Sequence, residues 1–129
     1  MTKPRIFISF DFDNDSDLKE LLVGQSKNEN SPFEIADWSL KDSLSGDWKE
    51  KIKPRIKSCH QVIVICGEKT DKAPGIDHEL EVAQEEEKPY FLLYGRGGKT
   101  CKKPKTAKAG DKMYKWTWDN LKSLIKGNR

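Results

Sequence analysis

The sequence predicts a three-layer α/β fold of the flavodoxin-like type, with helices on both faces of a five-stranded, mostly parallel sheet. Two observations lead to this prediction. Short apolar runs rich in β-branched and aromatic residues alternate with segments whose apolar residues recur at helical spacing. The runs at 5–10 and 61–66 are nearly unbroken, which is typical of strands buried on both faces of a parallel sheet. Right-handed crossovers then favour the strand order 2-1-3-4-5.

The first half of the chain contains two predicted strands and two predicted helices. After the strand at 5–10, an acidic turn leads into a helix near 15–27, which Asn14 or Asp15 would cap. A weaker, alternating strand at 33–38 is expected at an edge of the sheet. The next helix begins near Asp47, and Pro54 is expected to kink it or to mark a fresh first turn.

The second half continues the alternation. The strand at 61–66 is the strongest in the chain, because its β-branched run fits a central position in the sheet. Four more elements follow the same signals: a helix around Ile76, Leu80 and Ala83, a strand at 90–94, an edge strand at 113–116, and a closing helix around Leu121, Leu124 and Ile125.

Residues 96–112 are expected to form a long, mobile, solvated loop, since they include seven basic residues and three glycines and have no apolar period. The segment before Cys101 ends in Gly-Lys-Thr, as a Walker A loop does. However, Leu93 stands where that motif needs a glycine, five residues before Gly98. The loop also lacks the interleaved aromatic residues that would stack on nucleic-acid bases.

The composition bounds the class of protein. A chain of 129 residues, 35% hydrophobic and 35% charged, has room for one core, so we expect a single domain over 1–129. Its apolar runs are far shorter than the roughly 18 residues that a membrane-spanning helix needs. Since the N-terminus lacks a signal-peptide pattern, we expect a cytoplasmic protein with no membrane partner. The formal net charge of +3 is too balanced to imply a nucleic-acid partner.

Candidate metal ligands are few. The three cysteines lack CxxC spacing, so reduced thiols are expected, and His60 and His78 have no partner at ligand spacing. The acidic turn at 11–17 is explained by helix capping and solvation. We therefore predict no metal site.

The strand order also predicts where a ligand would bind. In such sheets the ligand lies beyond the carboxyl ends of the strands, where the winding direction reverses between the first and third strands. The loops at 11–15, 38–46 and 67–75 border that point. Trp38 is the only tryptophan that this topology places near the cleft.

Several segments in this order resemble a known family. They are the start Phe7–Asp15 (FISFDFDND), the stretch Val62–Thr70 (VIVICGEKT), the helix segment Ile76–Ala83 (IDHELEVA) and Lys88-Pro89-Tyr90. In order and spacing they resemble TIR-like domains, specifically the branch that contains the TIR-like protein of the Thoeris anti-phage system. The resemblance covers about 4–95 and the closing segment at 116–125.

The resemblance implies an enzyme that takes NAD as its substrate and needs no cofactor or metal. It would cleave the bond between nicotinamide and ribose and make an ADP-ribose-derived signal nucleotide for anti-phage defence. Glu79 matches the catalytic position of the family. A carboxylate suits this chemistry because it stabilises the oxocarbenium-like ribose or orients its hydroxyls. Without the resemblance, Glu79 is one acid among several on a solvated helix.

The resemblance also suggests substrate-binding residues. Phe10, Asp11 and Phe12 would line the floor and rim beneath the dinucleotide, and Trp38 would stack on a base or close over it. Because successive side chains of a strand point to opposite faces, we expect Phe10 and Asp11, rather than Ser9, to meet the ligand.

One departure from the family leaves a second interpretation open. Many TIR enzymes have a tryptophan four residues before the glutamate, where this chain has Gly75. The alternative is a non-catalytic TIR-like scaffold that assembles through its helices and the loop at 38–46. The resemblance further implies self-association and a separate effector protein that senses the product.

Overall fold

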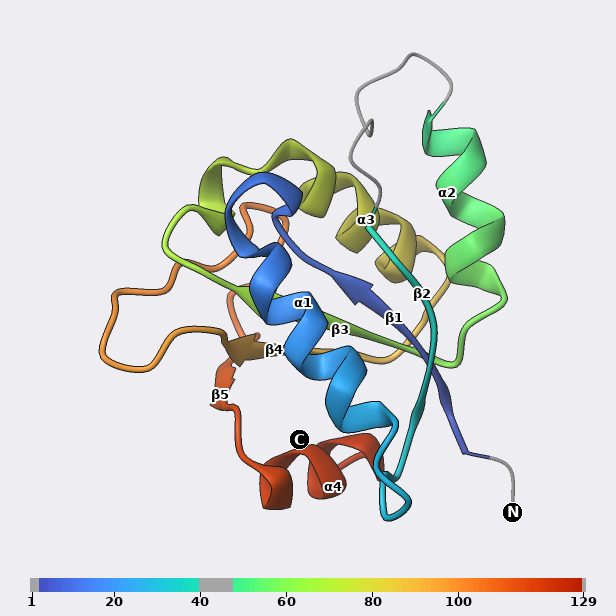
Figure 1. Ribbon diagram of the computed structural model, residues 1–129. Coiled ribbons are helices and arrows are strands. Elements are labelled where there is room, and N and C mark those ends of the chain that lie inside the picture. Colours follow the sequence, from blue (N-terminus) through green and yellow to red (C-terminus); the bar gives the residue numbers. More distant parts are fainter. Residues whose placement is uncertain (1–2, 40–47, 129) are drawn as a thin grey trace.

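The computed structural model describes residues 3–39 and 48–128, and in these residues five strands form one sheet (Figure 1). The strands pair in the order β2-β1-β3-β4-β5, and every neighbouring pair is parallel. This order confirms the prediction. The strands are β1 (Arg5–Ser9), β2 (Glu34–Trp38), β3 (Gln61–Cys66), β4 (Tyr90–Tyr94) and β5 (Met113–Lys115).

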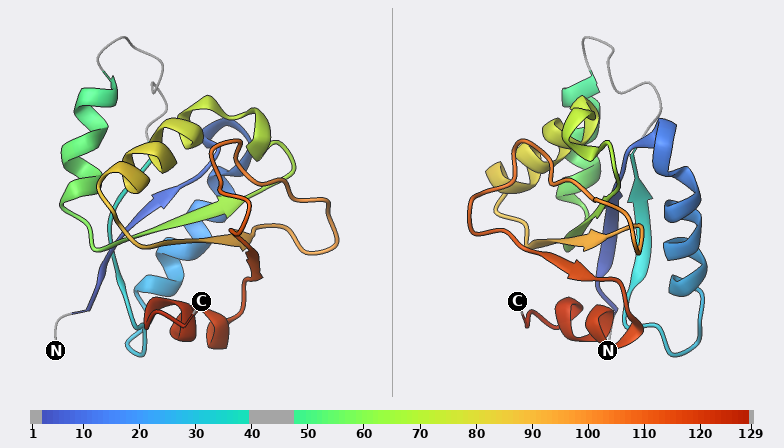
Figure 2. Two further views of the ribbon diagram at one scale, coloured as in Figure 1. Left: turned by 180° about the vertical axis from the view of Figure 1, so that it is seen from behind. Right: turned by 90° about the vertical axis from the view of Figure 1, so that its left-hand side faces the viewer.

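Helices cover both faces of the sheet (Figure 2). On one face lie α1 (Phe12–Ser26) and α4 (Trp118–Ile125), and on the other lie α2 (Trp48–Lys57) and α3 (Pro74–Glu85). A short 3-10 helix, η1 (Thr70–Lys72), precedes α3. None of the helices in the described part of the chain has the length and apolar character that crossing a bilayer requires.

The alternation of side chains along the strands divides the core in two. On β3, Val62 and Val64 face α2 and α3, whereas Ile63 and Ile65 face α1 and α4, and all four are completely buried. A strand buried on both sides needs an unbroken apolar run, which is the pattern that predicted the central position of β3.

The first helix begins earlier than the sequence analysis expected. The N-cap of α1 is Asp11, whose carboxylate accepts a hydrogen bond from the Asp13 amide at 3.2 Å, so neither Asn14 nor Asp15 is the cap. The acidic turn is therefore the first turn of the helix. Asp15 departs from helical geometry (φ −126°, ψ 21°) and kinks α1 there. Pro54 lies inside α2 rather than at the start of a fresh helix.

The loop after β4 contacts α3 and the end of β3 at a few points, while its lysines are exposed to solvent; its mobility stays a prediction. Cys101 is buried, and the Lys102 amide donates to the Gly67 carbonyl at 2.9 Å. Further along, Gln84 of α3 donates from Nε2 to the Thr106 carbonyl at 2.9 Å. The absence of apolar periodicity concealed this packing because polar side chains and backbone groups make these contacts.

Gly67, directly after β3, is the position where we expect the fold to be least tolerant of a methyl group. A Cβ there would lie 2.2 Å from Oδ2 of Asp15, and Asp15 is itself buried and held by Arg96. We predict that Gly67→Ala lowers the free energy of unfolding by about 1–3 kcal/mol, measured by urea denaturation. Gly24→Ala is the matched control, because Gly24 lies in α1 with open space around it and the change should stabilise by about 0.5–1 kcal/mol. Equal effects of the two substitutions would contradict the steric argument.

Candidate active site

Glu79 of α3 lies buried against the carboxyl end of the sheet, with only 1% of its surface exposed. Its Oε1 atom accepts two hydrogen bonds, from Ser9 Oγ at 2.7 Å and from Ser39 Oγ at 2.6 Å. Ser9 ends β1, and Ser39 directly follows β2. The carboxylate therefore joins α3 to the ends of two neighbouring strands.

The periodicity of each element explains why these groups meet. In α3, Ile76, Glu79 and Ala83 recur at helical spacing and are all buried toward the sheet. In β1, Phe7 packs in the core on the α3 side, so Ser9, two residues further, points to the same face. The strand thus presents Ser9 to Glu79.

Ser39 connects the site to the backbone of β1. Its amide donates to the Ile8 carbonyl at 3.0 Å, and its Oγ accepts from the Phe10 amide at 3.0 Å. A hydroxyl has one proton to donate, and the short contact with Glu79 uses it. Ser39 is buried, so its orientation is fixed by these partners. A rigid hydroxyl of this kind positions the carboxylate that it contacts.

Burial raises the pKa of Glu79 to about 7. The hydrogen bonds from Ser39 and Ser9 and the charge of Arg55 lower this pKa, and Asp37 raises it, but burial outweighs the groups that lower it. Arg55 itself forms an ion pair with Asp37. The protonated and the ionised forms are therefore both accessible near neutral pH, a property that groups in catalytic sites often share.

The second carboxylate oxygen of Glu79, Oε2, is buried and has no hydrogen-bond partner among the residues that the structure describes. Buried polar atoms without a partner are rare in folded proteins because each loses its bonds to water. Of the two oxygens, Oε2 is thus the one with acceptor capacity left for a ligand hydroxyl.

The predicted substrate-binding side chains lie apart from Glu79. The Phe10 ring is 2% exposed in the core on the α1 side and stacks on Phe12, with 5.7 Å between the ring centroids. Trp38 is 37% exposed, and Lys19 of α1 places its Nζ atom 4.7 Å from the centroid of that ring. Phe10 and Phe12 pack with the core on the α1 side and Trp38 packs with Lys19 of α1, so the sheet separates these rings from Glu79.

Asp11 is occupied by the start of α1. Its carboxylate accepts hydrogen bonds from the Asp13 amide at 3.2 Å and from Asn14 Nδ2 at 2.7 Å. The structure thus does not gather Phe10, Asp11, Phe12 and Trp38 around the carboxylate, and their roles in substrate binding stay predictions. Phe10 reaches the site through its backbone amide, which donates to Ser39.

Two residues that hold Glu79 were not predicted from the sequence. They are Ser9 and Ser39, and both stand at strand ends beside the point where the winding direction of the sheet reverses. A serine at the end of an otherwise apolar, buried strand is the sequence signal that could have indicated a role for Ser9 in the site. Ser39 carries no comparable local signal, because its partners lie far away in the chain.

A second polar cluster lies at the ends of β1 and β3. A pocket of about 270 Å³ opens there beside Asp15, Glu68, Lys69 and Arg96. Arg96 donates to Asp15 at 3.2 Å and to Asp17 at 2.8 Å, and burial raises the pKa of Asp15. Both signs of charge are present, and no group of three His, Cys, Asp or Glu suited to a metal ion is found among the described residues.

The fold and the site together define a small α/β domain with a parallel sheet. Its buried glutamate lies near the point between β1 and β3 where the winding direction of the sheet reverses. Among solved structures, one titled "Crystal Structure of a prokaryotic SEFIR domain" is similar, with a TM-score of 0.56 and 20% sequence identity. The match covers 96% of this chain and 91% of that chain, and at this identity it shows the fold alone.

The family model described as "Thoeris protein ThsB, TIR-like domain" matches residues 7–99, well over half of the chain. The chain therefore belongs to the TIR-like domain family of Thoeris protein ThsB, which confirms the resemblance found in the sequence. No protein of curated function matches the chain significantly.

The raised pKa of Glu79 predicts a pH-dependent stability difference. The pKa is about 7 in the folded chain and 4.5 as the ordinary value. The folded state therefore binds the proton of Glu79 more tightly than the unfolded state does. The protonated carboxyl group contributes its full share to the free energy of unfolding below pH 4.5, and that contribution is lost as the pH rises to 7. Glu79→Gln keeps the neutral form at every pH. Relative to wild type, we expect it to gain roughly 3 kcal/mol of unfolding free energy between pH 4.5 and pH 8.

Urea denaturation of both proteins at the two pH values measures this gain. Glu85→Gln, an exposed position on the same helix, is the control and should show no such change. A pH-independent difference between Glu79→Gln and wild type would contradict the burial argument.

Proposed function

We propose that this chain is a TIR-like enzyme that consumes NAD, cleaving the bond between nicotinamide and ribose. Its product would be an ADP-ribose-derived signal nucleotide in anti-phage defence, which membership of the ThsB family supports. The observation that carries the proposal is the state of Glu79, a buried carboxylate with one oxygen fixed by two serines and one without a partner among the described residues.

The chemistry requires a fixed negative charge beside the ribose. As the glycosidic bond breaks, its electron pair goes to the nicotinamide nitrogen and cancels the pyridinium charge. Positive charge then develops on the ribose until water, or a hydroxyl of the same nucleotide, attacks the anomeric carbon and loses its proton to solvent. Ionised Glu79 would stabilise that charge through Oε2, while Ser9 and Ser39 hold Oε1 in place. The pKa of about 7 leaves a large ionised fraction at neutral pH.

The burial of Glu79 bears on how such an enzyme would be controlled. With 1% of the residue exposed, a substrate can reach the carboxylate only after neighbouring groups move. A resting enzyme of this kind would turn over little NAD. We therefore expect cleavage to depend on a trigger that appears during phage infection.

Nicotinamide release measures the proposed activity directly. Concentrated protein is incubated with NAD, with and without phage-infected lysate, and nicotinamide is followed by mass spectrometry. We predict release that infected lysate increases, and a loss of about 100-fold or more in Glu79→Gln, because a charge aimed at the transition state is removed. Glu85→Gln, on the exposed side of α3, should retain wild-type release. Equal release by Glu79→Gln and wild type would remove Glu79 from this role.

A scaffold without catalysis is the second candidate, favoured by the same burial. Ser9, Ser39 and Glu79 can act as a purely structural tie between α3 and the strand ends. Gly75 also gives the start of α3 no side chain where many TIR enzymes have a tryptophan. Absence of nicotinamide release under both conditions would favour this alternative.

A further inference from the structure

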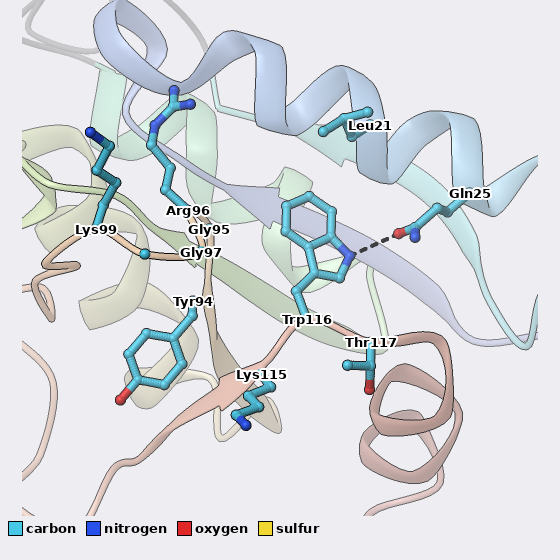
Figure 3. A pocket seen from close by; sticks show the side chains of 11 residues that line it. Leu21, Gln25, Tyr94, Gly95, Arg96, Gly97, Lys99, Lys115, Trp116 and Thr117 are labelled. Carbon is cyan, nitrogen blue, oxygen red and sulfur yellow. Dashed lines mark hydrogen bonds between the residues drawn. The ribbon is translucent and has the colours of Figure 1, made fainter.

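A pocket of about 760 Å³ opens between α1 and the carboxyl ends of β4 and β5 (Figure 3). Its volume is within the range of roughly 300–1,000 Å³ that small-molecule sites occupy. The pocket lies on the α1 side of the sheet, whereas Glu79 lies on the α3 side. It is therefore separate from the site proposed for NAD cleavage.

One wall of the pocket is aromatic and apolar. The indole of Trp116 borders the cavity, and its Nε1 atom donates to Oε1 of Gln25 at 2.8 Å, as Figure 3 shows. This hydrogen bond fixes the orientation of the ring before any ligand arrives. Leu21 of α1 lies across from it and is 60% exposed, so its side chain is available to a ligand in the pocket. Together the two side chains form a surface on which a planar ring can stack.

The other end of the pocket is suited to an anion. Gly97 and Gly98 lie in the turn after β4, and a Cβ at either would meet nothing within 4 Å. Within the described residues, no hydrogen bond from either amide to another group is found. Gly98 has a φ of +75°, in the left-handed region where glycine is favoured. Both glycines are exposed, so their amides are accessible to donate to a negatively charged oxygen, as successive amides of such turns do in known anion sites.

Positive charge surrounds the same turn. Lys99 is exposed at the rim, and Arg96 borders the pocket while it also pairs with both Asp15 and Asp17. Those ion pairs neutralise the Arg96 charge, so Lys99 and the amides carry the attraction. The wider segment 96–112 holds seven basic residues against one acidic residue, which adds a long-range positive potential.

We propose that this pocket binds a small ligand of the nucleotide class, with a planar heteroaromatic base and a phosphate group. The base would stack on Trp116 beside Leu21, and the phosphate would lie against the amides of Gly97 and Gly98 with Lys99 nearby. The arrangement does not depend on a Walker A loop, which this segment lacks. It goes beyond the proposed cleavage of NAD and holds whether or not Glu79 is catalytic.

Isothermal titration calorimetry of the full chain with AMP tests the proposal. Adenosine and ribose 5-phosphate each offer half of the ligand, and we predict that both bind at least tenfold more weakly than AMP. Lys99→Glu and Leu21→Glu should each weaken AMP binding at least tenfold, because both put negative charge at the pocket on exposed, fold-tolerant positions. Trp116→Leu should do the same by removing the stacking surface.

Two control variants complete the experiment. Lys57→Glu changes the same charge on α2, away from the pocket, and Glu85→Gln changes an exposed acid of α3; both should bind AMP as wild type does. The proposal is overturned if AMP does not bind at millimolar concentration, or if inorganic phosphate binds as tightly as AMP. It is equally overturned if Lys99→Glu and Leu21→Glu leave the affinity unchanged.

Discussion

The buried carboxyl group of Glu79 is the constraint around which one half of this domain is arranged. Placing a carboxylate away from water is costly, and the chain offsets part of that cost with hydrogen bonds from Ser9 and Ser39. Burial still dominates, since it holds the pKa at about 7. The end of β1, the residue after β2 and the second turn of α3 must therefore keep their relative positions for the group to stay paired. A hydrophobic side chain would fill the same space at lower cost, which is why we interpret the carboxylate as functional.

The parallel sheet separates two chemically different regions. On the α3 side, hydroxyls and a carboxylate meet at the strand ends, and on the α1 side, a pocket combines Trp116 with a glycine-rich, basic turn. Alternation along the strands enforces this division, because neighbouring residues such as Ser9 and Phe10 contribute to opposite faces. Arg96 links the turn after β4 to α1 through Asp15 and Asp17, and it also borders the pocket. A ligand in the pocket would thus contact a residue that already fixes the start of α1.

Most of the fold could be predicted from the sequence, and less of the site. The β-branched run at 61–66 and the helical spacing around Glu79 are strong local patterns, and they led to the observed strand order and to the right helix. The start of α1 was misplaced because several acidic residues there are competent caps, and only the structure shows that Asp11 takes that place. The partners of Glu79 could not be found in this way, since the hydrogen bonds from Ser9 and Ser39 span 70 and 40 residues of sequence. Such contacts depend on how strands and helix pack, which no local pattern records.

The most direct test of this account is the titration of the Glu79 carboxyl group itself. Carbon-13 NMR of the side-chain carboxyl, assigned by comparison with Glu79→Gln, reports its ionisation free of contributions from other acids. The account predicts a midpoint near pH 7, caused by burial that the two serine hydrogen bonds only partly offset. A midpoint near the ordinary value of 4.5 would show that water reaches the carboxylate, and it would contradict the buried, poised group on which the proposed chemistry depends.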